Sequence, residues 1–258
     1  MRQVSTILTC LTSSPGPDLT NPNREPLVED DEVREFQQDE DPVGRVRALI
    51  VVTHPEAEHH VAGLVGGWCE SALTARGEEQ ARRIATYLRA RIPEAAPVEI
   101  HSSDLRRCVQ TATQIAGRVQ ASIVLSPDLR EISYGEAEGK PQAWLQARFR
   151  FPPPENNPAR LDHEYGLPGA ESRRNAATRV YRAMEKILAS PVDQQIIVTH
   201  GFVLTFIVAS WIGTPVEAVG LIGIPAHSGS ITVLRQEAPF YNRSVVTLNN
   251  TSHLAQTR

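Results

Sequence analysis

Short apolar runs alternate along this chain with longer segments whose apolar residues recur at helical spacing. The runs are rich in β-branched and aliphatic residues, which is typical of strands buried on both faces of a sheet. The predicted strands cover residues 47–53, 97–102, 122–125, 195–199, 230–235 and 244–248. The predicted helices cover residues 74–91, 104–116, 171–189 and 202–212. Strands that alternate with helices predict an α/β fold, here three α/β/α layers around a mostly parallel central sheet.

Two of the predicted helices have a polar residue suited to cap their first turn. Thr74 precedes the helix of residues 74–91, and Ser103 precedes the helix that we expect to begin at Asp104. The first helix carries Ala81, Ile84 and Leu88 on one face. The later helix carries Val180, Met184, Ile187 and Leu188 on its apolar face. The region 148–169, rich in proline and asparagine, is predicted as a loop.

The first 45 residues differ from the rest of the chain. They are rich in Pro, Asn, Ser, Asp and Glu and hold ten acidic and four basic residues. No amphipathic pattern in them would contribute to a core, so we predict an acidic, disordered tail over residues 1–45. A single domain is predicted over residues 46–258, which are enough to bury a sizeable core.

Three polar side chains are expected to meet at one edge of the predicted sheet. His54 and His200 each follow an apolar run, and Arg107 lies in the first turns of the helix after residues 97–102. Side chains that follow parallel strands face the ligand crevice of open α/β sheets. Two imidazoles and a guanidinium suit a phosphoryl group, because one imidazole can attack phosphorus while the other groups hold the charged oxygens.

Composition and charge exclude several classes of protein. The net charge is −4 for the 258 residues, and the body after residue 45 is close to neutral, which does not indicate nucleic-acid binding. No apolar run is long enough to span a membrane. Three cysteines without metal-type spacing indicate reduced thiols in the cytoplasm. The first residues have only a weak likeness to a secretion signal, since their apolar stretch is short and interrupted by polar residues.

Six segments in order resemble the histidine phosphatase superfamily, with its phosphoglycerate-mutase-like fold. They are THPE at 53–56, GGWCESALTARG at 66–77, SSDLRRCVQTA at 102–112, LREISYGEAEG at 129–139, GLPGAES at 166–172 and VTHG at 198–201. The resemblance implies that His54 is a nucleophile that becomes phosphohistidine, with Arg107 and His200 holding the phosphoryl oxygens. It implies that Glu131 protonates the leaving oxygen and later activates water. A carboxyl group shielded from water can act as an acid near neutrality.

The first motif departs from the Arg-His-Gly of the family. This chain has Thr53-His54-Pro55, so a neutral hydroxyl stands where a guanidinium would fork onto phosphate. The loss of such charged hydrogen bonds would cost about 1.5–3 kcal/mol each. Where the family often has a phosphate-binding asparagine, this chain has His60, beside His59, and we expect one of these imidazoles, especially if protonated, to replace part of the lost charge.

Some assignments leave an alternative open. Glu136 is the second choice for the acid, and Arg106 lies beside Arg107. The resemblance places Glu171 and Ser172 beside the phosphate pocket, although a capped helix N-terminus explains the pair almost as well. No metal and no cofactor are predicted, because the adjacent histidines 59 and 60 are expected to point in different directions and no ligand set accompanies them.

Together these features predict a phosphomonoester hydrolase that acts on a small phosphorylated metabolite. A phosphoglycerate-mutase-type phosphotransferase is an alternative, although the short insert between Gly139 and Gly166 favours a phosphatase. A second alternative is a family member that binds an anionic ligand or a partner without turnover. A third is a site for a substrate that carries less charge than a phosphate dianion. The apolar segment 202–213 fits a core helix or a homodimer face equally well.

Overall fold

A computed structural model describes residues 46–255 of the chain. Its centre is a six-stranded sheet in the order β3-β2-β4-β1-β5-β6. The first four of these strands run parallel to one another, whereas β5 pairs antiparallel with β1 and with β6. The strands are β1 (Val46–Thr53), β2 (Val98–Ser102), β3 (Ile123–Leu125), β4 (Gln194–Thr199), β5 (Ile231–Glu237) and β6 (Asn242–Asn250).

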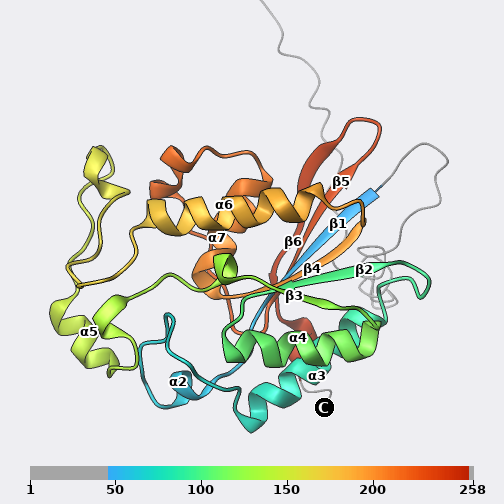
Figure 1. The fold of residues 1–258 in the computed structure, drawn as a ribbon, viewed down its shortest axis with the longest axis horizontal. Helices are drawn as coiled ribbons and strands as arrows, with labels where there is room; N and C mark the ends of the chain where they lie inside the picture. The colour runs from blue at the N-terminus through green and yellow to red at the C-terminus, as the bar shows by residue number, and fades with distance from the viewer. Residues whose placement is uncertain (1–45, 256–258) are drawn as a thin grey trace, which may run out of the picture.

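Helices cover both faces of the sheet, as Figure 1 shows, with α6 and α7 on one side and α3 and α4 on the other. The α-helices are α2 (Glu58–Val61), α3 (Ala75–Arg89), α4 (Arg106–Val119), α5 (Gln142–Arg148), α6 (Arg173–Ala189) and α7 (Gly201–Trp211). Five short 3-10 helices complete the described part: η1 (Pro127–Leu129), η2 (Gly135–Ala137), η3 (Pro158–Arg160), η4 (Val216–Leu221) and η5 (Ser252–Leu254). This arrangement confirms the predicted three-layer α/β/α fold with a mostly parallel sheet.

The core consists of two apolar layers, one on each face of the sheet. One layer joins α6 and α7 to strand residues such as Leu49 and Ile197, and the other joins α3 and α4 to residues such as Ile50 and Ile196. Successive residues along β1, and likewise along β4, thus pack into opposite layers. Every residue of β4 is buried, which is consistent with the apolar run of residues 196–198 between its polar ends.

Most helix boundaries lie close to the predicted ones, with one exception and some short additions. Thr74 caps α3 through Gly77 N–H, as expected. Helix α4 begins at Arg106 rather than at Asp104, and its N-cap residue Leu105 offers no side-chain cap. Ser103 is instead turned toward His200, as described below. Neither helix α2 nor helix α5 was predicted, and α5 ends at Arg148, where the predicted loop begins. The predicted acidic tail lies outside the described residues.

The pairing of β1 with β4 brings the two motif histidines together. Thr53 and Thr199 are register partners at the ends of these parallel strands, so His54 and His200 follow at the same edge. Strand β1 also lies where parallel neighbours give way to the antiparallel β5–β6 pair. The described residues contain no helix long and apolar enough to cross a membrane.

Candidate active site

His54 is buried just beyond β1, and backbone and side-chain contacts fix its ring. Its N–H donates to Thr199 O at 2.9 Å, and its carbonyl accepts from Gly229 N. The ring Nδ1 lies 2.9 Å from Pro55 O, and since a carbonyl only accepts, Nδ1 carries the hydrogen. Nε2 therefore keeps its lone pair. Burial, and then the charge of Arg107, hold the pKa of His54 well below its usual range, so the imidazole is neutral and nucleophilic near neutral pH.

Arg107 is a buried side chain that reaches His54 from the first turn of α4. Its Nε donates to His54 Nε2 at 3.1 Å. Its terminal nitrogens donate to the carbonyls of Cys69 and Gly67 at 2.9 and 2.7 Å. Three of the five guanidinium N–H groups are used in this way, which leaves two for a ligand. The loop of residues 67–69 thus anchors a cation directly beside the candidate nucleophile.

His200 lies behind His54 rather than on the cavity wall. It is fully buried, and its ring is edge-on to that of His54, with the centroids 5.1 Å apart. Its Nε2 lies 2.8 Å from Ser103 Oγ and 3.4 Å from Cys108 Sγ. Burial, and secondarily the charge of Arg107, lower the pKa of His200 well below its usual range. In the same surroundings burial raises the pKa of the Cys108 thiol to about 12, so this thiol stays protonated.

The carboxyl group of Glu131 faces the cavity and lies beside the first turn of α7. One oxygen accepts from Ile132 N at 2.9 Å, and the other accepts from Phe202 N at 3.1 Å. Those two hydrogen bonds favour the ionised form, but burial is the larger effect and raises the pKa of Glu131. A carboxyl group with a raised pKa is suited to donate a proton near neutral pH.

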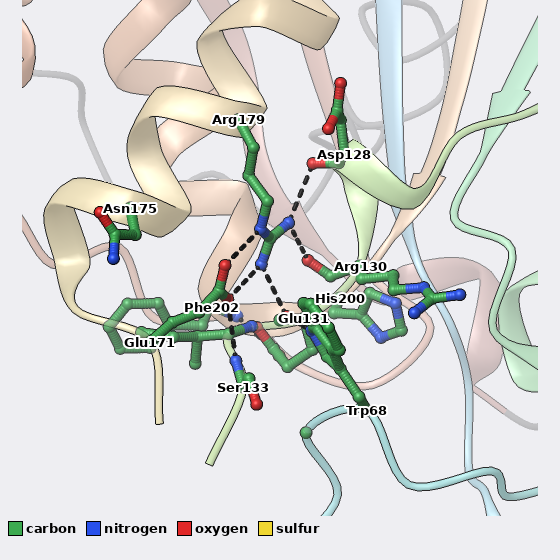
Figure 2. Close-up of polar contacts among 12 residues, drawn as sticks. Trp68, Asp128, Arg130, Glu131, Ser133, Glu171, Asn175, Arg179, His200 and Phe202 are labelled. Carbon is green, nitrogen blue, oxygen red and sulfur yellow. Dashed lines mark hydrogen bonds and ion pairs between the residues drawn. The ribbon is translucent and has the colours of Figure 1, made fainter. Parts of the chain in front are cut away.

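A brace from α6 holds the backbone of Glu131. Arg179 donates both Nε and NH2 to the carboxylate of Glu171, at 2.8 and 2.7 Å (Figure 2). Its remaining N–H groups reach the carbonyls of Asp128, Arg130 and Glu131 at 2.6–2.9 Å. All five guanidinium donors are therefore used. Glu171 also accepts from Ser133 N at 2.9 Å, so the pair fixes the chain on both sides of Glu131.

Loss of this brace is expected to destabilise the fold. Arg179→Ala would leave the largely buried Glu171 carboxylate without its cation and should lower the free energy of unfolding by about 3–5 kcal/mol. Arg182→Ala is the matched control from the next turn. Its side chain is 56% exposed and pairs with Asp128, so we expect a loss of at most about 1 kcal/mol. Urea denaturation measures both values, and equal losses would contradict the brace.

These groups surround a cavity of about 440 Å³. Five of the residues predicted from the sequence lie on its wall: Thr53, His54, His60, Arg107 and Glu131. The structure also separates the competing assignments. Arg106 and Glu136 are exposed, whereas Arg107 and Glu131 face the cavity. The geometry thus favours Arg107 over Arg106 and Glu131 over Glu136, whereas His200, which was expected to hold phosphoryl oxygens, is not on the described wall.

The Thr53 hydroxyl does not have the predicted role. It donates to His227 O at 2.6 Å and accepts from Ser230 N at 3.0 Å. A hydroxyl has a single hydrogen, so none remains for a phosphate oxygen in this arrangement. Thr53 instead joins the end of β1 to the loop before β5.

Glu171 and Ser172 also differ from the expectation that they border the pocket. Neither residue lies on the described part of the cavity wall. Ser172 caps α6 by accepting from Asn175 N at 3.2 Å, and Glu171 binds Arg179. The alternative interpretation, a helix N-terminus, is the one that matches the structure.

The paired histidines lie closer together than their adjacency suggested. The rings of His59 and His60 have centroids 4.0 Å apart, and both face the cavity, so the expectation that they diverge is wrong. Ring nitrogens of His54, His59 and His60 all lie within 4.8 Å of one another, close enough to hold a metal ion after small movements. However, Arg107 donates to His54 Nε2, and its positive charge would oppose a cation there.

Three supporting residues have contacts that the sequence did not predict. Arg179 occupies a polar position on the buried face of α6. Gly229 has a φ of +76° and places its N–H on His54 O. Trp68 donates its indole N–H to Glu131 O at 2.6 Å, beneath the guanidinium of Arg130. Each acts through contacts between segments far apart in sequence, which a pattern along the chain does not show.

Comparisons with known proteins agree with the geometry. Residues 49–251 match the model of the histidine phosphatase superfamily, branch 1. The probable phosphoglycerate mutase GpmB of Erwinia tasmaniensis is 31% identical over 81% of this chain and 95% of its own. The putative phosphoserine phosphatase 2 of Hydrogenobacter thermophilus is 30% identical over 82% and 99%. A solved mycobacterial glucosyl-3-phosphoglycerate phosphatase superposes with a TM-score of 0.64, at 24% identity over 80% of this chain and all of that one.

Proposed function

This chain belongs to the histidine phosphatase superfamily, and from that premise we propose that it hydrolyses small phosphomonoesters through a phosphohistidine at His54. The observation that carries the proposal is the state of the His54 ring. Its Nδ1–H is held by a carbonyl, and its Nε2 carries no hydrogen and accepts a hydrogen bond from Arg107 Nε at 3.1 Å. Relatives named as phosphatases support hydrolysis as the outcome.

The proposed reaction has two steps. In the first, His54 Nε2 attacks phosphorus, the ester P–O bond breaks, and the leaving oxygen takes the proton of Glu131. In the second, the Glu131 carboxylate removes a proton from water as its oxygen attacks phosphorus, and the P–N bond breaks to release His54 and phosphate. Arg107 stabilises the phosphoryl oxygens in both steps, because phosphoryl transfer depends mainly on position and charge.

His60 is proposed to supply part of what the missing motif arginine would have given. Its Nδ1 accepts from Ala57 N at 3.2 Å, so in the neutral ring the hydrogen is on Nε2. Burial, and then the charge of Arg107, lower the pKa of His60, which favours this neutral ring. The ring lies parallel to that of His54, with the centroids 5.5 Å apart. We therefore expect one neutral hydrogen bond to phosphate instead of a charged pair.

His60→Ala is expected to weaken inhibition by inorganic phosphate about 3- to 10-fold, the effect of losing one neutral hydrogen bond. His60→Asn keeps an N–H donor on a shorter side chain and should recover part of the affinity. The inhibition constant of phosphate against a chromogenic ester measures both. An unchanged constant in His60→Ala would show that this ring does not contact phosphate.

The function itself is tested by phosphate release from a panel of phosphomonoesters that includes p-nitrophenyl phosphate. Release from several small esters is the expected result. Interconversion of 2- and 3-phosphoglycerate without release of phosphate would favour the phosphotransferase alternative. Relatives named as probable phosphoglycerate mutases are the reason to include this reaction. Neither activity, with phosphate still bound, would indicate a binding protein.

A further inference from the structure

We infer that the substrate of this site is a phosphate ester of an alcohol that carries no carboxylate. The inference rests on the proposed function and concerns the part of the cavity that receives the alcohol. It matters because the names of relatives point both ways. Phosphoglycerate and phosphoserine carry a carboxylate close to the ester oxygen, and a solved α-ribazole phosphatase from Shigella flexneri is named for a substrate without one.

The charged groups on the cavity wall are already used by the chemistry. Of the described residues that line it, Arg107 is the single lysine or arginine, and Glu131 is the single acid. Arg107 is bound to His54 and to two backbone carbonyls at the phosphoryl end. No second lysine or arginine on the described wall is therefore left for a carboxylate.

Two guanidinium groups close to Glu131 and Trp68 have partners of their own. Arg130 forms two hydrogen bonds with Asp104, at 2.7 and 2.6 Å. Arg179 uses all five of its donors on Glu171 and three carbonyls. Recruitment of either one to a substrate carboxylate would leave a partly buried acid without its cation.

Apart from Arg107 and Glu131, the described wall has no lysine, arginine or acid, and it offers hydrogen bonds to the alcohol. It contains Leu64, Tyr134, Gln142, Leu145, His227 and Ser228. The Tyr134 phenol, the Gln142 amide and the Ser228 hydroxyl can bind substrate hydroxyl groups without any charge. A substrate carboxylate in this place would lie near Glu131 and would have no opposite charge, so both desolvation and repulsion disfavour it.

Two pairs of esters that differ at the carboxylate test the inference. The first pair is glycerol 3-phosphate and 3-phosphoglycerate, and the second is phosphoethanolamine and phosphoserine. We expect kcat/KM to be at least about 10-fold higher for the member without the carboxylate in both pairs, as for one unpaired charge at the edge of a site. Equal or higher values for the carboxylate-bearing members would overturn the inference. No release from these esters or from p-nitrophenyl phosphate would instead overturn the proposed function.

A charge introduced on α5 provides a matched variant. Gln142→Arg places a guanidinium on the cavity wall, and we expect it to reduce the kcat/KM ratio within each pair. Gln146→Arg adds the same charge to an exposed position one turn later, outside the described wall, and should leave the ratio unchanged. The same ratio in both variants would show that this part of the wall does not contact the alcohol.

Discussion

His54→Ala is expected to reduce kcat/KM at least about 10³-fold for every phosphomonoester, because it removes the atom that bonds to phosphorus. Two neighbouring imidazoles, those of His200 and His60, do not offer a substitute. His200 Nε2 is engaged with Ser103, and His60 carries its hydrogen on Nε2. In the wild type, rapid acid-free quenching should trap a phosphoenzyme that is labile in acid and stable in base, and the variant should form none.

The control for this variant is His163→Ala, another histidine whose ring lies off the described cavity wall. It should retain kcat/KM, so a general effect of losing an imidazole can be separated from loss of the nucleophile. If His54→Ala kept its turnover while remaining folded, phosphohistidine chemistry at this residue would be refuted.

The low pKa of His54 also has a consequence for the pH profile. Protonation of Nε2 would remove the lone pair, so activity should fall only when the pH drops through a pKa that burial and Arg107 have lowered below the usual range. We therefore expect the acid limb of kcat/KM to lie below the ordinary histidine pKa.

The elements of the fold were predictable because they depend on local pattern. Strand β4 contains the apolar run of residues 196–198, and helix α3 has both its cap Thr74 and its buried stripe, so each of them has a signal within its own segment. His54 and His200 were predictable for a related reason, since parallel strands end at one edge. The resemblance then separated Arg107 from Arg106, which composition alone would not.

What the sequence did not predict depends on partners far along the chain. The Thr53 hydroxyl is bound by the backbone at His227 and Ser230, more than 170 residues away. Arg179 binds carbonyls about 50 residues before it. Backbone carbonyls exist at every position, so no residue type marks them as partners, and such contacts become visible only when the chain is folded.

Because the motif arginine is absent, the remaining groups must stabilise more of the transition-state charge. With one guanidinium and neutral donors at the phosphoryl end, the transition state receives less charge stabilisation than two guanidinium groups would give. The expulsion of a poor leaving group therefore depends all the more on a proton from Glu131. This makes Glu131 the residue whose replacement should separate substrates most clearly.

Glu131→Gln is expected to lower kcat/KM about 10²- to 10⁴-fold for alkyl phosphates, the range for loss of a general acid, and less than about 10-fold for p-nitrophenyl phosphate. The nitrophenolate leaves without a proton, and kcat/KM reports steps only up to the first irreversible one. Glutamine preserves the shape, but its single carbonyl oxygen can replace only one of the two carboxylate oxygens that accept from Ile132 N and Phe202 N.

The pH profile gives an independent measure of the same group. Burial raises the pKa of Glu131, so the wild-type acid form persists above the ordinary range of glutamic acid, and kcat/KM for alkyl esters should fall as the pH rises through that raised pKa. This basic limb should disappear in Glu131→Gln and remain in Glu136→Gln, the exposed neighbour that is the control. Equal losses on both classes of ester would mean that Glu131 holds the fold of the site rather than supplying the proton. A substrate-dependent loss together with a missing basic limb would require that the proton comes from this carboxyl, since a distorted site alone does not distinguish leaving groups by their basicity.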